Sequence, residues 1–250
     1  AGVDKFSVTV TDNSNAQSSS TITIDIVDDK PLPGADSASV TEDGTSDSDP
    51  LTVQSVTANV MTNDVSGADA PASFVVWTSA LTGNWGVLTD KGNGSYIYTL
   101  NNDDPKVQAL TADDIKTDSF TYTMKDADGD VKTETLTVTI HGTNDIPTIE
   151  VNSGNPENAN DVVNESGLSP DGTEAGVAVL VAEGSFKLGD ADGLSNLKSV
   201  TIDGTEIQIS ELGTGNTIDG AHGTLTITGF DDTTGDVTYS YLLTSPVSNA

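Results

Sequence analysis

The segment Asp126-Ala127-Asp128-Gly129-Asp130 places three carboxylates at alternate positions around a glycine. Hard divalent cations such as Ca²⁺ bind about six to eight oxygen atoms, and carboxylates with this spacing in a tight turn can converge on one ion. The segment is not an EF-hand loop, because the glycine is its fourth residue rather than its sixth and Thr137 replaces the bidentate glutamate. On these residues alone, Asp126, Asp128 and Asp130 form either a calcium site or a solvated acidic turn.

Further oxygen ligands stand in and beside two short acidic segments that each end in a proline, at Pro31 and Pro147. Proline fixes its own φ angle and stiffens a linker. In a sandwich we expect Asn144, Asp145 and Glu42 to lie near the Asp126–Asp130 turn. The candidate ligands are Asp28 and Asp29 with Glu42, Asn144 and Asp145 with Glu165, and the pair Asp190 and Asp192, which either bind an ion or only form a turn.

Composition excludes several other kinds of chemistry. The 250 residues contain no cysteine, which removes disulfides, thiol nucleophiles and thiolate metal sites, and the two histidines, His141 and His222, are far apart. The 9 basic residues are all lysines and face 39 acidic ones, giving a net charge of -30, so a nucleic-acid partner is not expected. No apolar run approaches the roughly 18 residues of a membrane span, so we expect no direct membrane insertion.

The chain contains an internal repeat of a β-hairpin. The segment from Asp4 to Ile26 returns without a gap 114 positions later, from Asp118 to Ile140. Phe120, Tyr122 and Met124 alternate with polar residues, and this period of two predicts a strand with one buried and one solvated face. Each copy is therefore expected to be a hairpin followed by an acidic linker.

A second repeated element lies before the hairpin. Gly86-Val87-Leu88-Thr89 leads to Tyr96-Ile97-Tyr98, and Gly223-Thr224-Leu225-Thr226 leads in the same way to Tyr239-Ser240-Tyr241. Short strands and frequent turn signals predict an all-β fold of tandem immunoglobulin-like antiparallel sandwiches, with a helical turn or two from Pro105 to Asp113. We expect residues 1–33 to be the C-terminal hairpin of one module, 34–147 a complete module, and 148–250 the N-terminal part of another.

Four ordered blocks of the complete module resemble VCBS repeats, which are cadherin-like modules of giant bacterial surface adhesins of the RTX type. The blocks are Val60-Met61-Thr62-Asn63-Asp64, Gly92-Asn93-Gly94-Ser95-Tyr96, Asp126-Ala127-Asp128-Gly129-Asp130 and Gly142-Thr143-Asn144-Asp145-Ile146-Pro147. The resemblance implies a cadherin-like fold, calcium sites at module junctions, type I secretion and a place on the surface of a Gram-negative bacterium. Together with the acidic linkers, it favours calcium over a solvated turn at Asp126–Asp130.

The leading hypothesis is a structural extender repeat of a calcium-stabilised adhesin or extracellular fibre, supporting cell adhesion or biofilm formation. Like charges at turns and linkers repel one another, and divalent cations remove that repulsion. Its expected partners are neighbouring repeats of the same protein and, beyond them, cell-surface or matrix glycans. The alternative is a calcium-dependent sugar- or peptide-binding module using Trp77 or Trp85, although a sandwich core favours packing for such residues. An enzyme is not expected.

The two incomplete modules have complementary deficits. Residues 148–250 lack a closing hairpin, and residues 1–33 are a hairpin that lacks its front half. An unpartnered half-sandwich would expose an apolar face and open strand edges. We therefore expect residues 1–33 to pair with the 148–250 part of a neighbouring unit in a tandem array, the alternative being a chain trimmed at arbitrary points.

Overall fold

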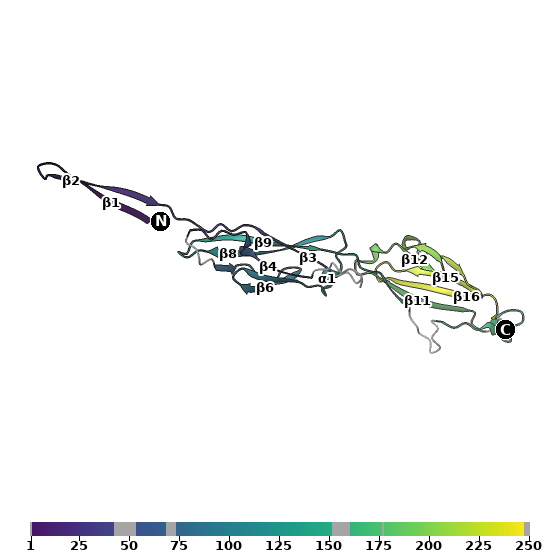
Figure 1. The fold of residues 1–250 in the computed structure, drawn as a ribbon. Coiled ribbons are helices and arrows are strands. Elements are labelled where there is room, and N and C mark those ends of the chain that lie inside the picture. Colours follow the sequence, from purple (N-terminus) through teal and green to yellow (C-terminus); the bar gives the residue numbers. More distant parts are fainter. Residues whose placement is uncertain (1, 43–53, 69–73, 152–160, 177, 248–250) are drawn as a thin grey trace. The chain divides into compact units, whose positions relative to one another are not determined.

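The computed structural model describes residues 2–42, 54–68, 74–151, 161–176 and 178–247, drawn as a ribbon in Figure 1. These residues form an all-β fold in which the helical elements are single short turns. The predicted helical segment is one of them, α1 from Pro105 to Gln108. The fold class predicted from the sequence, an all-β fold of antiparallel sandwiches, is confirmed.

The complete module contains two antiparallel sheets. One sheet has the strand order β3-β9-β8-β5 and the other has the order β4-β7-β6. Their bounds are β3 Asp36–Thr41, β4 Ser55–Asn59, β5 Phe74–Trp77, β6 Gly86–Gly92, β7 Ser95–Leu100, β8 Ile115–Lys125 and β9 Val131–His141. The repeated hairpin supplies β8 and β9, which are the two central strands of the four-stranded sheet.

The core of this module follows the period-two pattern read from the sequence. The inward residues of β8 and β9 are fully buried, and so are Tyr96 and Tyr98 of β7. Ring contacts join the two sheets, because Tyr98 meets Phe120 at a centroid distance of 5.9 Å and Trp77 meets Tyr96 at 6.0 Å. Trp77 also contacts Tyr122. The tryptophan therefore packs in the core, as the sequence predicted.

The first hairpin copy forms β1, Gly2–Thr11, and β2, Gln17–Ile26. Phe6 lies opposite Ile22 and Val8 lies opposite Ser20 in the register. Directly opposed residues share a face of an antiparallel pair, so the large apolar side chains gather on one face and the other face is mainly polar. The residues of that apolar face are all exposed: Phe6, Val8, Val10, Ile22, Ile24 and Ile26.

A second compact unit contains the remaining strands. Its sheet has the strand order β10-β11-β16-β15-β14, beside a separate β12-β13 hairpin. The bounds are β10 Thr148–Val151, β11 Val181–Gly189, β12 Ser199–Ile202, β13 Thr205–Gln208, β14 Thr217–Asp219, β15 Gly223–Phe230 and β16 Asp236–Leu243. Its core gathers around Phe186, Ile207, Ile227 and Val237. In the described part of residues 148–247, no second hairpin with the sequence of β8-β9 occurs.

Candidate metal centre

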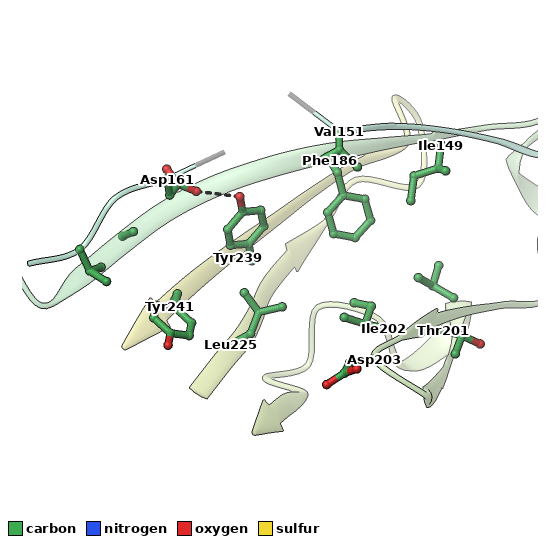
Figure 2. Close-up of a pocket in the computed structure, with 13 residues that line it drawn as sticks. Ile149, Val151, Asp161, Phe186, Thr201, Ile202, Asp203, Leu225, Tyr239 and Tyr241 are labelled. Carbon is green, nitrogen blue, oxygen red and sulfur yellow. Dashed lines mark hydrogen bonds between the residues drawn. The ribbon is translucent and has the colours of Figure 1, made fainter. Parts of the chain in front are cut away.

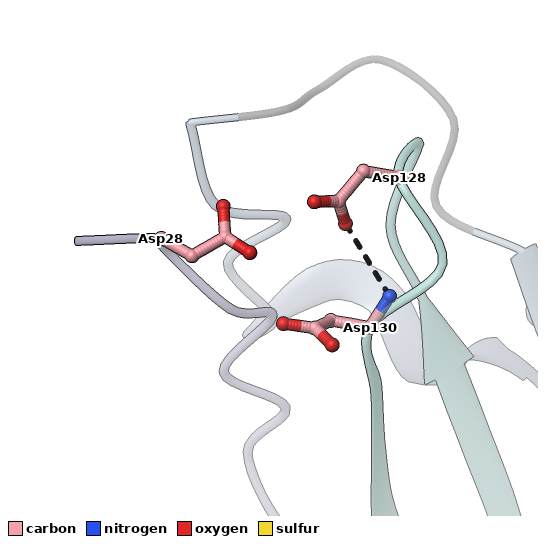
Figure 3. Close-up of side chains that lie close together, drawn as sticks. All are labelled: Asp28, Asp128 and Asp130. Atoms are coloured by element: carbon pink, nitrogen blue, oxygen red, sulfur yellow. Dashed lines mark hydrogen bonds between the residues drawn. The ribbon is translucent and has the colours of Figure 1, made fainter. Parts of the chain in front are cut away.

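Three carboxylates come together at the turn between β8 and β9. The side chains of Asp28, Asp128 and Asp130 each offer an oxygen atom, and these atoms lie within 4.8 Å of one another (Figure 3). Asp28 belongs to the acidic linker that follows β2, whereas the other two belong to the turn. We name these three residues the turn cluster. Its spacing suits a divalent cation that takes several oxygen ligands at about 2.3–2.6 Å.

Asp126 shapes the turn that carries this cluster. Its Oδ1 accepts hydrogen bonds from the backbone N–H of Gly129 at 3.0 Å and of Asp130 at 2.7 Å. Asp12 in the first hairpin copy makes the equivalent bond, accepting from the N–H of Ala16 at 2.8 Å. Since the first copy lacks the other two turn carboxylates, Asp126 holds the turn in both copies, while Asp128 and Asp130 are the additions that make a cation site possible.

A lysine partly neutralises the turn cluster. Lys30 Nζ lies 2.9 Å from Asp130 Oδ2 in an ion pair, and both side chains are partly exposed. The hydrogen bond with Asp130, then its charge and those of Asp28 and Asp126, raise the pKa of Lys30. The hydrogen bond and charge of Asp126 raise the pKa of Asp128. A divalent cation at this turn would compete with the Lys30 ammonium for Asp130 and with a proton for Asp128.

A second group of acids surrounds the linker that follows β9, and we name it the linker cluster: Glu42, Asn144, Asp145, Asp190 and Asp192. Glu42 and Asp145 are fully buried. Glu42 Oε2 accepts from the N–H of Thr143 at 3.3 Å, and Asp192 Oδ2 accepts from the N–H of Asp145 at 2.9 Å. These bonds tie the residue after β3, the linker and the loop after β11 into one acidic centre.

Asn144 and Asp190 make further hydrogen bonds in the linker cluster. Asn144 Nδ2 donates to the carbonyl oxygen of Asp145 at 2.7 Å, which leaves its Oδ1 directed toward Asn196 Nδ2 at 3.4 Å. Asp190 Oδ1 accepts from the N–H of Asp192 at 3.0 Å. Asn196 Nδ2 also donates to Asp192 Oδ2 at 3.1 Å. The loop from Asp190 to Asn196 is therefore folded around the same oxygen atoms.

Burial and the charges of neighbouring acids disfavour the ionised forms of Glu42 and Asp190. Desolvation, followed by the charges of Asp145, Asp192 and Asp114, raises the pKa of Glu42 to about 7. Desolvation, then the charges of Asp192 and Asp145, raises the pKa of Asp190. Neither Glu42, Asp190 nor Asp192 has an ion-pair partner among the described residues. As far as the chain is described, no ion pair therefore neutralises Glu42, Asp190 or Asp192.

Two buried carboxylate oxygen atoms show whether the linker cluster suits a hard cation. Glu42 Oε1 and Asp192 Oδ1 are buried and have no hydrogen-bond partner within the described part of the chain. A buried carboxylate oxygen without a partner is costly, and a cation that binds oxygen ligands would supply that partner. The set contains carboxylate and amide oxygens and neither thiolate nor imidazole, which suits calcium better than a transition metal. We conclude that the linker cluster fits Ca²⁺.

The structure groups the predicted ligands differently from the sequence analysis. The expectation that the Asp126–Asp130 turn lies near Asn144 and Asp145 is wrong, because the turn precedes the 11-residue strand β9 and the linker follows it. At about 3.3 Å per residue, a strand of that length separates its two ends by more than 30 Å. The prediction from sequence groups Glu42 with Asp28 and Asp29. Asp28 precedes β3 and Glu42 directly follows it, so Glu42 belongs to the linker cluster instead.

Besides Asp126, two predicted ligands belong to neither cluster. Asp29 Oδ2 accepts from the N–H of Ala68 at 2.8 Å, which fastens the first linker to the loop after β4. Glu165 Oε2 accepts from the N–H of Val247 at 2.8 Å, so its contact lies within the second unit.

Lys30 and Asp118 were not singled out from the sequence. A single lysine inside an acidic linker, and an aspartate kept in both hairpin copies as Asp4 and Asp118, are the signals that could have indicated them.

The turn cluster predicts a difference between two matched substitutions. Asp128→Ala should weaken calcium binding at this turn about tenfold, because the ion loses one of three converging carboxylates. Ser14→Ala at the equivalent position of the first copy removes no carboxylate and should leave binding unchanged. Calorimetric titration of both variants and the parent chain checks this expectation. Equal affinities in the parent chain and in Asp128→Ala would mean that the turn is only solvated.

Comparison with known proteins agrees with the fold. Residues 28–142 match the family model of the bacterial cadherin-like domain. This segment contains the whole turn cluster and Glu42. No curated protein matches the chain. Within the described residues, no helix is long and apolar enough to cross a membrane.

Solved structures similar to the chain are mainly ectodomains of cadherins. The extracellular cadherin domains 1–4 of protocadherin gamma B7 are 14% identical, with a TM-score of 0.42 over 98% of this chain and 49% of that one, so the chain spans about half of that structure. The human desmocollin-1 ectodomain is 15% identical, with a TM-score of 0.32 over 93% of this chain and 35% of that one. A Ca²⁺-stabilised adhesin with which an Antarctic bacterium binds ice is 16% identical, with a TM-score of 0.24 over 97% and 56%. The match to the bacterial cadherin-like domain thus covers the strands β3 to β9 of this all-β chain.

Proposed function

We propose that this chain is a structural extender segment of a calcium-stabilised bacterial surface adhesin or extracellular fibre, supporting cell adhesion or biofilm formation. The observation that carries the proposal is the linker cluster, in which buried and partly buried acids from three separate segments of the chain converge, and in which Glu42 Oε1 and Asp192 Oδ1 are buried without a hydrogen-bond partner in the described part of the chain. A bound calcium ion would join these segments and fix the linker. A module held in this way transmits force and spans distance, and needs no catalytic group.

The chemistry of such sites suggests where the protein works. Extracellular calcium modules typically have dissociation constants of about 10⁻⁴–10⁻³ M, so they are loaded outside cells and empty in cytosol. The -30 net charge would keep the metal-free chain extended by self-repulsion. We infer that the protein crosses the cell envelope of a Gram-negative bacterium through type I secretion, as the VCBS resemblance implies, and stiffens at the cell surface. Its partners would be neighbouring repeats and, at the adhesive end, surface or matrix glycans.

Small-angle X-ray scattering of the 250-residue chain tests the mechanical role. With 5 mM CaCl₂ the chain should give a narrower distribution of interatomic distances than with excess chelator at equal ionic strength, because calcium fixes the linker that follows β9. Glu42→Gln combined with Asp192→Asn should give the chelator profile even in calcium. Identical profiles of the parent chain in the two buffers would contradict the extender function.

A further inference from the structure

The two modules share one structural motif that is complete in the first and incomplete in the second. In the complete module, Leu88 of β6 pairs with Tyr98 of β7. In the second unit, Leu225 of β15 pairs with Tyr241 of β16 in the same register. Gly86 packs under the ring of Tyr98, and a Cβ at Gly223 would likewise lie 2.6 Å from the hydroxyl of Tyr241. Leu225 and Tyr241 are therefore the structural counterparts of Leu88 and Tyr98.

Burial of these counterparts differs sharply between the modules. Leu88 is 1% exposed and Tyr98 is 0% exposed, whereas Leu225 and Tyr241 are only partly buried. The ring of Tyr98 is covered by Phe120, which belongs to the β8-β9 hairpin. In the second unit, Leu225 and Tyr241 instead line an open, mostly apolar groove of about 560 Å³. Figure 2 shows Phe186, Ile202, Leu225 and Tyr241 around that groove.

The β1-β2 hairpin carries the side chains that would fill such a groove. By the 114-residue repeat, Phe6 corresponds to Phe120 and Ile22 to Leu136. Phe120 and Leu136 are 0% exposed, whereas Phe6 is 54% and Ile22 is 53% exposed. Because the two hairpins have similar sequences, the difference in exposure between them comes from what covers each hairpin. As far as the chain is described, the apolar face of this hairpin is exposed and the groove of the second unit is open.

A buried aspartate adds polar complementarity to this match. Asp118 Oδ2 on β8 accepts a hydrogen bond from the Tyr98 hydroxyl at 2.7 Å and from the N–H of Gly86 at 3.1 Å. Asp4 of β1 is the counterpart of Asp118 in the repeat. The hydroxyl of Tyr241, the counterpart of Tyr98, has no hydrogen-bond partner among the residues that the structure describes. Asp4 would supply the acceptor that the second unit lacks.

We propose that the apolar face of the β1-β2 hairpin of one chain fills the groove of the second unit of another copy, with Phe6 against Leu225 and Tyr241 and with Asp4 accepting from the Tyr241 hydroxyl. The contact joins two different surfaces of the same chain, so it is heterologous and produces head-to-tail assemblies, either rings or open filaments. It buries apolar side chains and an aspartate against a tyrosine and involves no acid of either metal cluster. It is therefore independent of the calcium-dependent function proposed above and is tested in the presence of chelator.

Analytical ultracentrifugation of the 250-residue chain in chelator tests this contact. The parent chain should form concentration-dependent oligomers with a dissociation constant at or below about 100 µM. Phe6→Asp should abolish them, whereas Ser7→Asp on the opposite, polar face of the same strand should not. Asp4→Asn should weaken association about tenfold, and Asp25→Asn on the polar face should leave it unchanged. A parent chain that is monomeric at all concentrations, or a Phe6→Asp chain that associates like the parent, would overturn the proposal.

Mixing two blocked chains identifies the two surfaces. Leu225→Asp blocks the groove, and Val151→Asp is a second groove variant whose parent side chain is 52% exposed, so that it need not disturb folding. Each groove variant should be monomeric alone, as should Phe6→Asp. An equimolar mixture of Phe6→Asp with a groove variant should form a dimer of twice the 25.7 kDa chain mass, since one intact hairpin meets one intact groove. Mixtures that remain monomeric, including the case in which each hairpin folds onto its own chain, would overturn the proposal.

Discussion

Without calcium, one buried acid should lower the free energy of unfolding by about 2 kcal/mol between about pH 4.5 and pH 7, and calcium should abolish this contribution. The reason is Glu42, whose pKa desolvation and the neighbouring acids raise from 4.5 to about 7 in the folded chain. A folded state that binds a proton more tightly than the unfolded chain is stabilised below pH 4.5 and loses that stabilisation as the pH rises through 7. A bound cation favours the ionised carboxylate and lowers its pKa, so calcium removes the cause.

Urea unfolding at several pH values, with calcium and with chelator, measures this effect. Asp36 is a second source of the same trend, because desolvation raises its pKa to about 6, and it belongs to neither metal cluster. Glu42→Gln should therefore remove the part of the pH dependence that responds to calcium, while Asp36→Asn should remove only the part that does not. If calcium left the pH profile of the parent chain unchanged, the linker cluster would not be a calcium site.

Asp118→Ala should lower the free energy of unfolding of the complete module by about 4 kcal/mol. Asp118 is 3% exposed and accepts hydrogen bonds from the Tyr98 hydroxyl and from the backbone N–H groups of Asn84 and Gly86. The substitution leaves the buried Tyr98 hydroxyl and the buried Gly86 N–H without their acceptor, which costs more than the loss of the hydrogen bonds themselves.

Asp4→Ala is the matched control for this prediction. Asp4 occupies the same position of the other hairpin copy but is exposed in the single chain. Its removal should change the stability of the monomer by less than about 0.5 kcal/mol. Thermal unfolding at a concentration at which the chain is monomeric compares the two variants. Equal effects would mean that Asp118 is not the central acceptor of the sandwich core.

Alternation and internal repetition were enough to predict much of the fold. The strands β8 and β9 follow directly from inward residues such as Phe120 and Ile140, whose period of two is unbroken. The 114-residue repeat also predicted the β1-β2 hairpin, since the same residue types recur at the same positions. Turn residues at Gly92-Asn93-Gly94 predicted the β6-β7 hairpin, where Asn93 and both glycines have positive φ angles. These are local properties, and local sequence determines them.

The grouping of the metal ligands could not be predicted in this way. Carboxylates are so abundant in this chain that proximity along the sequence does not indicate which ones meet in space. Glu42 joins Asp192, 150 positions away, because the ends of β3 and β9 and the loop after β11 bring them together. Asp29 and Glu165 look equivalent to true cluster members in the sequence, yet each instead accepts a backbone hydrogen bond elsewhere. Strand order, and not spacing, decides which acids converge.

The most direct test of the central claim is the melting temperature of the metal-free chain at pH 7 as a function of calcium concentration. The account predicts a rise that is half complete at about 10⁻⁴–10⁻³ M calcium, with a much smaller rise for magnesium at equal ionic strength. Glu42→Gln with Asp192→Asn should remove most of the response, because these residues hold the buried oxygen atoms that lack a partner in the described chain. A melting temperature that is the same in calcium and in chelator would contradict a calcium-stabilised repeat.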